Sequence, residues 1–240
     1  MENSKNGCML CPRECNADRE RGENGICGVS GTGIMGARAA LHMWEEPCIS
    51  GTRGSGTVFF SGCNLHCVFC QNFDISCKGF GKEITVERLQ EIYQELIAKG
   101  AHNINLVTPT HFTEAVLKSL EKPLSVPVVY NTSGFETQDT LRRLKGKVQI
   151  YLPDLKYSDD VAAIKYSNAP YYFRIATDAI KEMYRQVGDY ELDENGLLKK
   201  GVVIRHLILP GMLDNSKRVI DWVANTFKPG QVMFSLMHQY

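Results

Sequence analysis

From residue 57 to residue 237, short apolar runs alternate with segments of helical spacing, and no other feature constrains the fold as strongly. The apolar runs have the length and composition of buried strands; they are 57–60 (TVFF), 103–107, 126–131, 148–152, 201–209 and 231–237. Helical patterns separate them at 85–100, 111–122, 137–146, 159–187 and 214–227. Strands that alternate with helices pair in parallel through right-handed crossovers. The sequence therefore predicts an α/β fold on six parallel strands, arranged as a sheet or as a barrel.

Residues 1–55 have a different composition, rich in glycine and charge (RERGENG, GTRGSG) and with little periodicity. Such a composition predicts loops. We therefore expect a small cysteine-rich, loop-rich segment and linker over 1–55, and the α/β domain over 56–240. The sequence stops directly after its last predicted strand, with nothing to cover that strand, which leaves open whether the native chain extends past Tyr240.

The charge and the cysteine content narrow the class of protein. Lys and Arg together number 27, as do Asp and Glu, and no basic stripe stands out, so we expect neither nucleic acid nor membrane as a partner. The polar start (MENSKNG) and the lack of any run of about 18 apolar residues predict a cytoplasmic protein, whose thiols stay reduced. Nine cysteines in that compartment indicate a metal site or reactive thiols, and an odd number fits a closed set of disulfides poorly.

Polar clusters follow the predicted strands at the points where the strands end. They are 63–72, 108–111 (TPTH), 131–134 (NTSG) and 153–160 (PDLKYSDD), and the fifth strand carries Arg205-His206. In parallel α/β folds the carboxyl ends of the strands meet at one edge, where functional sites gather. We therefore expect these clusters to form one site.

Three cysteines in the first cluster, Cys63, Cys67 and Cys70, have the spacing C-x3-C-x2-C. A structural zinc site would need a fourth ligand, for which His66 and Cys77 are candidates. An iron–sulfur cubane held by three thiolates instead leaves one iron open to an exogenous ligand. Spacing and position favour the open cluster over zinc and over three buried thiols, and we expect His66 to be solvated.

This stretch resembles the radical S-adenosylmethionine (SAM) superfamily, whose hallmark is C-x3-C-x2-C with an aromatic residue, here Phe69, before the third cysteine. Residues 56–72 and the following GKEITVERLQ are similar to pyruvate formate-lyase activating enzymes, as are NTSGF, PDLK and IRHLILPG. CMLCPREC…GICG, EEPCISGTRGSG and NINLVTPTHF look closest to an activating-enzyme-like subgroup without an assigned substrate. The resemblance covers nearly the whole chain and implies a partial (β/α)6 barrel, open on one side.

By this resemblance, Cys63, Cys67 and Cys70 hold a [4Fe-4S] cluster whose open iron binds SAM. One electron, from a reductant such as flavodoxin or ferredoxin, cleaves SAM to a 5′-deoxyadenosyl radical that abstracts a hydrogen atom. The implied substrate is a glycyl-radical protein; a different peptide or a small molecule is the alternative, and so is a non-catalytic iron–sulfur or zinc protein. Because the cofactor carries the radical chemistry, no side chain is predicted to be catalytic.

The resemblance also implies residues that bind SAM. Asp154 and Lys156 would contact its carboxylate region, the Asp through a monovalent cation, although a surface ion pair is the alternative reading. Asn131 and Thr132 stand where relatives have Asp-Thr, and the amide weakens any such cation site.

Other candidate SAM-binding residues either depart from the pattern of the family or have an alternative structural role. Thr108-Pro109-Thr110 replaces the Gly-Gly-Glu that receives the amino group of SAM, so Thr108 and Thr110 would take over through hydroxyls and carbonyls. His206 is either near the ribose or adenine or a core residue, and Asn72 either binds the ribose or starts a turn. Phe69, with Phe59 and Phe60, would keep the cluster dry.

A second set of cysteines, Cys8, Cys11, Cys15 and Cys27, lies in the glycine-rich start. Four thiols in a segment with few apolar residues suit structural zinc or a single iron in place of a hydrophobic core. An auxiliary iron–sulfur cluster and no metal at all remain alternatives. Cys48 and Cys77 have no partner at ligand spacing and are predicted to be ordinary buried thiols.

Overall fold

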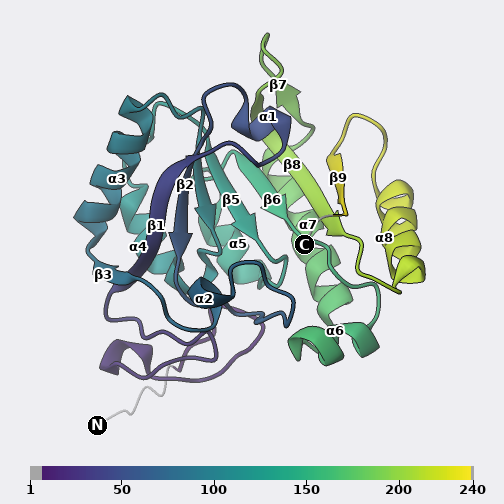
Figure 1. The fold of residues 1–240 in the computed structure, drawn as a ribbon, viewed down its shortest axis with the longest axis horizontal. Coiled ribbons are helices and arrows are strands. Elements are labelled where there is room, and N and C mark those ends of the chain that lie inside the picture. Colours follow the sequence, from purple (N-terminus) through teal and green to yellow (C-terminus); the bar gives the residue numbers. More distant parts are fainter. Residues whose placement is uncertain (1–6, 239–240) are drawn as a thin grey trace.

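The computed structural model describes residues 7–238 and is built on six parallel strands (Figure 1). These are β2 (Ser55–Phe60), β4 (Ile104–Val107), β5 (Val128–Thr132), β6 (Ile150–Pro153), β8 (Leu198–Leu207) and β9 (Met233–Met237). Each pairs in parallel with the next in that order. Within residues 7–238 no ladder joins β9 back to β2, so the curved sheet stays open. The predicted α/β class and all six strands are confirmed, as a partial (β/α) barrel.

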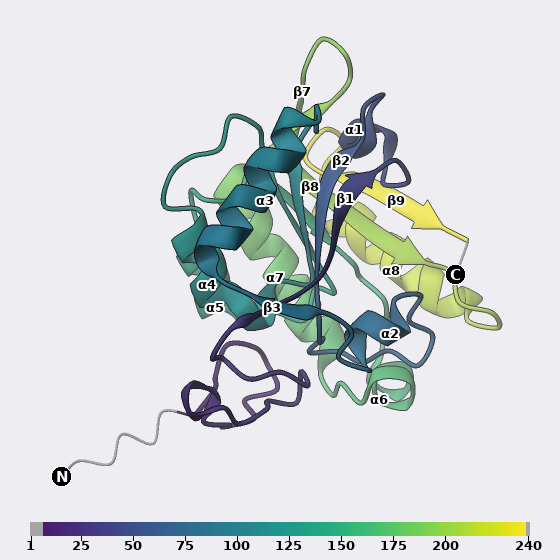
Figure 2. The same cartoon turned by 60° about the vertical axis from the view of Figure 1, so that its left-hand side comes forward.

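The helices pack on one face of the sheet (Figure 2). They are α3 (Val86–Ala98), α4 (Thr113–Ser119), α5 (Gln138–Leu144), α6 (Asp160–Ser167), α7 (Tyr172–Val187) and α8 (Leu213–Thr226). Shorter pieces are α1 (Pro47–Ser50), α2 (Phe73–Ser76), and the 3-10 turns η1 (Arg19–Arg21) and η2 (Thr110–Phe112). Of the helices in residues 7–238, none is both long and apolar enough to cross a bilayer.

Alternate residues of the strands face two different environments, as the pleat of a strand requires. On the outer face, Phe60, Leu106, Tyr130 and Tyr151 pack with Leu89 of α3 and Ile180 of α7 in the main core. On the inner face, Val129, Ile150, Leu152 and Val203 pack against Ile49 of α1 in a smaller core. The inner positions nearer the carboxyl ends of the strands belong to neither cluster, and these positions form the site.

Residues 34–42 correct one expectation. They form a nine-residue strand, β1 (Ile34–His42), antiparallel to β2 and to the short β3 (Lys82–Ile84). The prediction of little regular structure before residue 56 is therefore wrong here. The main chain of β1 is held by β2, but most of its side chains are partly exposed, so the sequence has no clear apolar alternation. The boundary predicted at 55–56 falls at the start of β2.

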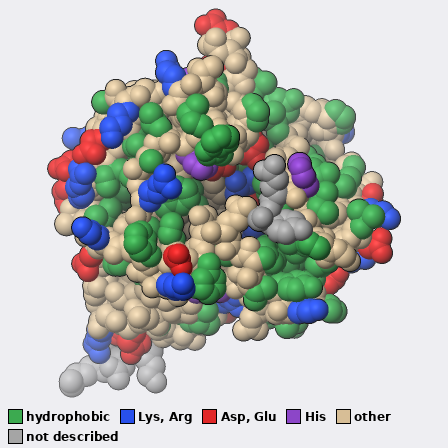
Figure 3. Space-filling model, in the orientation of Figure 1, with side chains coloured by type: hydrophobic (Ala, Val, Ile, Leu, Met, Phe, Trp, Pro, Cys, Tyr) green, Lys and Arg blue, Asp and Glu red, His purple; other side chains and the backbone are tan. Residues whose placement is uncertain are grey.

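The N-terminal segment (residues 7–33) is mostly loop and lies at the carboxyl ends of the strands, near α2 (Figures 1 and 2). On the face drawn in Figure 3, Lys and Arg are scattered among Asp and Glu. This mixture agrees with the equal numbers of the two charge types.

Candidate active site

A cavity of about 710 Å³ opens on the inner face of the sheet at the carboxyl ends of the strands. Its size is within the range of about 300–1,000 Å³ that is usual for small-molecule sites. The strands contribute Phe59, Val107, Asn131 and Arg205, which alternate with the core positions described above. This arrangement brings polar clusters at the ends of the strands together at one site, as predicted.

The cysteine loop (residues 61–72) forms one wall, and Cys63, Cys67 and Cys70 all line the cavity. Gly62 lets the loop leave β2, since its φ is +86° and a Cβ there would lie 2.6 Å from the carbonyl oxygen of Cys27. Burial, together with the neighbouring Cys67 and Cys70, raises the pKa of Cys63 to about 12. A thiolate at Cys63 therefore needs a cation beside it, such as a metal, to be stable.

A fourth ligand beside the three thiols would distinguish a zinc site from an open cluster. Among the described residues, which include both cysteine sets, no three Cys, His, Asp or Glu are placed to close on a single ion. His66 is turned away from the cavity, because one ring nitrogen lies 2.9 Å from the carbonyl oxygen of Ile26 and the other 3.3 Å from Cys77 Sγ. His66 therefore does not supply that fourth ligand.

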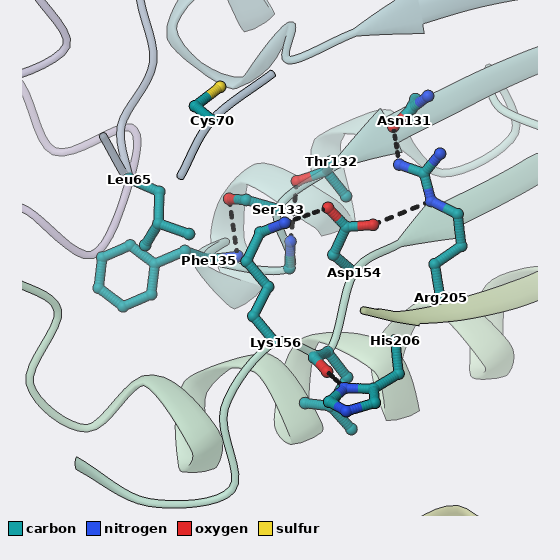
Figure 4. Close-up of polar contacts among 12 residues, drawn as sticks. Leu65, Cys70, Asn131, Thr132, Ser133, Phe135, Asp154, Lys156, Arg205 and His206 are labelled. Carbon is teal, nitrogen blue, oxygen red and sulfur yellow. Dashed lines mark hydrogen bonds and ion pairs between the residues drawn. The ribbon is translucent and has the colours of Figure 1, made fainter. Parts of the chain in front are cut away.

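A chain of four charged side chains faces the cysteine loop across the cavity, and Figure 4 shows three of them, Lys156, Asp154 and Arg205. Lys156 Nζ donates to Asp154 Oδ2 at 2.6 Å, and Arg205 Nε donates to Asp154 Oδ1 at 2.9 Å. Arg205 Nη1 continues the chain to Glu45 Oε2 at 3.1 Å. The side chains of Lys156 and Asp154 are only 17% and 15% exposed, so the reading of this pair as a surface ion pair is wrong.

Asp154, Lys156 and Arg205 hold one another in the charged state, whereas burial disfavours the charge of Glu45. Burial raises the pKa of Asp154, but the cations of Arg205 and Lys156 outweigh it and bring the pKa below its usual value. Burial likewise lowers the pKa of Lys156, and the charges of Asp154 and Cys67 more than reverse this. For Glu45, burial prevails over Arg205 and the pKa is raised. Lys156 gives one of its three ammonium hydrogens to Asp154, which leaves it able to bind an anionic group of a ligand.

Asn131 and Thr132 line the cavity but are engaged by neighbours. The Asn131 side-chain oxygen accepts from Arg205 Nη2 at 2.6 Å. Thr132 Oγ1 donates to Glu136 Oε1. Both residues thus fix other polar groups of this wall.

The structure places Thr108 and Thr110 in different environments. Thr108 lines the cavity in a left-handed conformation, with φ at +55°. Thr110 is buried outside the cavity lining and donates to Glu136 Oε1 at 2.6 Å. Glu136 is itself buried, its Oε2 has no partner, and burial raises its pKa to about 7. Sequence reasoning did not identify this carboxyl group.

His206 is not brought to the cavity. It is fully buried on the other face of β8, with Nδ1 2.6 Å from the carbonyl oxygen of Leu155 and Nε2 2.8 Å from Ser216 Oγ (Figure 4). The neighbouring Arg205 and Leu207 line the cavity instead. The structure thus gives His206 the core environment that was the alternative reading.

Asn72 and the aromatic residues can be placed as well. Asn72 lines the cavity, and although it precedes α2 its side chain makes no capping hydrogen bond. Phe69 lines the cavity and packs edge-on against Tyr157 and Tyr166. Phe59 also lines it, whereas Phe60 belongs to the main core.

The second cysteine set lies in the N-terminal segment, outside the cavity lining. Cys11 and Cys27 are buried, and Cys8 and Cys15 are partly buried. A Cβ on Gly25 would lie 3.2 Å from the sulfur of Cys27 and 3.3 Å from that of Cys15, so these two thiols share one narrow space. All nine cysteines are free thiols, as expected, and Cys48 and Cys77 are half-buried.

A partial α/β barrel with three cysteines and a charged chain facing one cavity defines a cofactor-dependent enzyme class. Residues 57–223 match the model of the Radical SAM superfamily, and the chain belongs to that superfamily. Membership implies an enzyme that uses a [4Fe-4S] cluster and SAM.

Individual proteins agree with this assignment. The uncharacterized protein MJ0674 of Methanocaldococcus jannaschii is 31% identical over 243 residues, which cover 97% of this chain and 65% of that protein. This chain therefore spans less than two thirds of the length of that relative. Among solved structures, methylornithine synthase (PylB) is similar with a TM-score of 0.50 at 16% identity, over 73% of this chain and 50% of that one. SuiB of Streptococcus suis is similar with a TM-score of 0.50 at 14% identity, over 75% and 38%. At these identities both structures support the fold.

Proposed function

We propose that this chain cleaves SAM reductively, with Cys63, Cys67 and Cys70 as the ligands of the [4Fe-4S] cluster and the 710 Å³ cavity as the SAM site. The observation that carries the proposal is that the three cysteines face a buried chain of charges across one cavity. When bound, the cluster and SAM supply a 5′-deoxyadenosyl radical for hydrogen-atom abstraction.

In this proposal the charged chain binds the amino-acid end of SAM. Lys156 binds the carboxylate, Asp154 fixes Lys156, and Arg205 fixes Asp154. Asn131 supports this arrangement rather than a cation site, because its side-chain oxygen is already held by Arg205. The monovalent cation implied by relatives thus has no carboxylate at position 131 to bind it, and Arg205 supplies positive charge there.

Other lining residues exclude water or contact the nucleoside. Phe59, Leu65 and Phe69 give the wall beside the cysteines its apolar surface, which keeps a low-potential cluster dry. Asn72, free of any capping bond, binds the ribose, and Thr108 offers its hydroxyl and carbonyl to the amino group of SAM. Thr110 and His206, which lie outside the lining, have no part in SAM binding in this proposal.

The substrate in this proposal is a peptide segment, with a glycyl-radical protein as one member of that class and a small molecule as the alternative. The open sheet supports a peptide, since a barrel that is not closed leaves a wide approach to the site. Trp44 supports it too, because it lines the cavity and is 86% exposed, ready to contact a bound chain. An activating-enzyme-like subtype, a flavodoxin or ferredoxin as reductant and a cytoplasmic location complete the proposal.

In this proposal the second cysteine set, Cys8, Cys11, Cys15 and Cys27, holds a further metal, as zinc, as a single iron or as an auxiliary cluster. In the structure no three of these thiols are placed to close on one ion, so metal binding would bring them closer together. The close approach of two of its sulfurs to Gly25 supports this. So does the small number of apolar side chains in the segment, which a bound metal would replace as a source of stability.

Anaerobic reconstitution tests the function. The protein is loaded with iron and sulfide, reduced, mixed with SAM, and analysed by chromatography for 5′-deoxyadenosine. We expect 5′-deoxyadenosine from the wild type and none from Cys67→Ala. If the wild type binds no iron while zinc fills both cysteine sets, the proposed function is wrong.

A further inference from the structure

The N-terminal segment touches the cysteine loop through side-chain and backbone contacts. We propose that the N-terminal segment, through Arg13 and the carbonyl group of Cys27, positions the loop that carries Cys63 and Cys67. The inference rests on the proposed function in one respect only, that these cysteines are cluster ligands. Arg13 is therefore a positioning residue that acts through the loop.

Arg13 lies between Cys11 and Cys15 in the sequence and binds main-chain oxygens of two other elements. Its Nε donates to the carbonyl of Asn64 at 2.7 Å, and Nη2 reaches that of Leu65 at 3.3 Å. At the end of α6, Nη2 donates to the carbonyl of Ser167 at 2.8 Å and Nη1 to that of Asn168. One planar guanidinium thus joins the cysteine loop to a helix end, which an ammonium group cannot do in the same geometry.

The backbone makes a second connection. The amide of Cys63 donates to the carbonyl of Cys27 at 3.1 Å. Gly62 allows this approach, because any Cβ there would collide with the same carbonyl oxygen. A candidate ligand of the second metal set and a candidate cluster ligand are therefore joined by a single hydrogen bond. A change in the order of one segment reaches the other through this bond.

The contacts bear directly on cluster loading. A flexible loop loses conformational entropy when its cysteines bind three irons, which weakens binding. A loop whose backbone is already fixed avoids this cost, so it binds the cluster more tightly than a flexible loop would. Arg13 therefore contributes order to the loop through its hydrogen bonds.

Three variants of the full chain test the positioning role of Arg13. Arg13→Gln removes the charge and most of the donors, Arg13→Lys keeps the charge but not the fork, and Arg21→Gln is a control on an arginine that is 86% exposed. The first measurement is hydrogen–deuterium exchange of the amides of residues 62–67 in protein without added metal. The second is the rate at which a chelator removes iron from the reconstituted protein.

We expect exchange of these amides to be about tenfold faster in Arg13→Gln, from the loss of charge-assisted hydrogen bonds, with Arg13→Lys close to it and Arg21→Gln equal to the wild type. Iron loss should rise in the same order. Exchange in α3 reports general unfolding and should be unchanged. If residues 62–67 exchange equally in Arg13→Gln and the wild type, the inference is wrong, whatever the cluster does. If neither the wild type nor any variant retains iron, but amide exchange is still faster in Arg13→Gln than in the wild type, the proposed function fails and the positioning role of Arg13 stands.

Discussion

The two cysteine sets have opposite order and different surroundings. The N-terminal set reads C-x2-C-x3-C before Cys27, and the cysteine loop reads C-x3-C-x2-C. Cys63, Cys67 and Cys70 face a cavity and a chain of charged side chains. In the N-terminal set, Cys15 and Cys27 lie beside Gly25, and the buried Arg19 binds the carbonyls of Val29 and Ser30, close to Cys27. The cavity described above is lined by the first set and not by the second, so cysteine spacing indicates a metal while the surroundings decide whether it can bind an exogenous ligand.

The largest expected effect compares one cysteine from each set. Cys67→Ala should reduce 5′-deoxyadenosine formation to background and abolish the cubane signal, because the loop then has two thiolates. Cys11→Ala should lose the metal of the N-terminal set and keep a cubane at the cysteine loop, which should lose iron faster because the N-terminal segment positions the loop. Metal analysis and electron paramagnetic resonance of the reduced proteins check this. If both variants lose the cubane signal equally, the distinction between the two sets is wrong.

The next effect concerns the chain of charged side chains that faces the cysteine loop and not the N-terminal set. Asp154→Asn leaves Lys156 and Arg205 buried without their shared partner, which should cost about 3–5 kcal/mol of stability and weaken SAM binding. The pKa of Asp154 is lowered in the folded protein, so its contribution is present at neutral pH and is lost as pH falls through the folded value.

Urea titrations from neutral to acid pH and SAM-binding measurements test this prediction. The matched control is Asp178→Asn, which removes an exposed pair with Lys181 and should cost less than about 1 kcal/mol. Equal losses in the two variants would contradict the role of the buried chain.

A third prediction uses Glu136, which binds Thr132 of the cavity wall and whose charge also influences Cys11 of the other set. Burial raises its pKa from 4.5 to about 7, so the folded protein keeps a proton that the unfolded chain has already lost. Stability should therefore fall by about 3 kcal/mol as pH rises from about 4.5 to about 7, and then level off. Glu136→Gln should lack this fall. Denaturation midpoints of both proteins across that range check it, and parallel curves would rule it out.

The smallest effect is expected at His206. His206→Gln loses hydrogen bonds to the carbonyl of Leu155 and to Ser216, at a cost of about 1–2 kcal/mol, and should leave SAM affinity unchanged. Arg205→Gln, one position earlier, should weaken SAM binding. Calorimetric titration of the two variants tests the pair. Weaker SAM binding by His206→Gln than by Arg205→Gln would reverse the assignment.

Much of the fold could be predicted because the parallel strands are buried on both faces and read as apolar runs. β1 could not, since it is held by main-chain pairing at the edge of the parallel strands and its side chains are partly exposed. At the site, Asp154 and Lys156 were found because they follow a strand and lie two residues apart, on one side of the backbone.

The remaining site residues depend on contacts that no local pattern encodes. Whether Arg205 or His206 faces the cavity depends on which face of β8 points inward. The apolar residues of this strand do not indicate that face. It is determined by the register of β8 with β6 and β9. Glu45 joins Arg205 across 160 positions of sequence. Glu136 is distinguished only by its burial, which the sequence does not reveal.

The bond from Arg13 to Ser167 has a consequence for how the protein is made. Its two ends are separated by 154 positions, so the ribosome releases Arg13 long before its acceptor exists. Until α6 has been synthesised and folded, the nascent cysteine loop lacks part of the framework that holds it. Iron delivered during translation would meet a loop that lacks these contacts, whereas iron delivered afterwards would meet a loop that already has them.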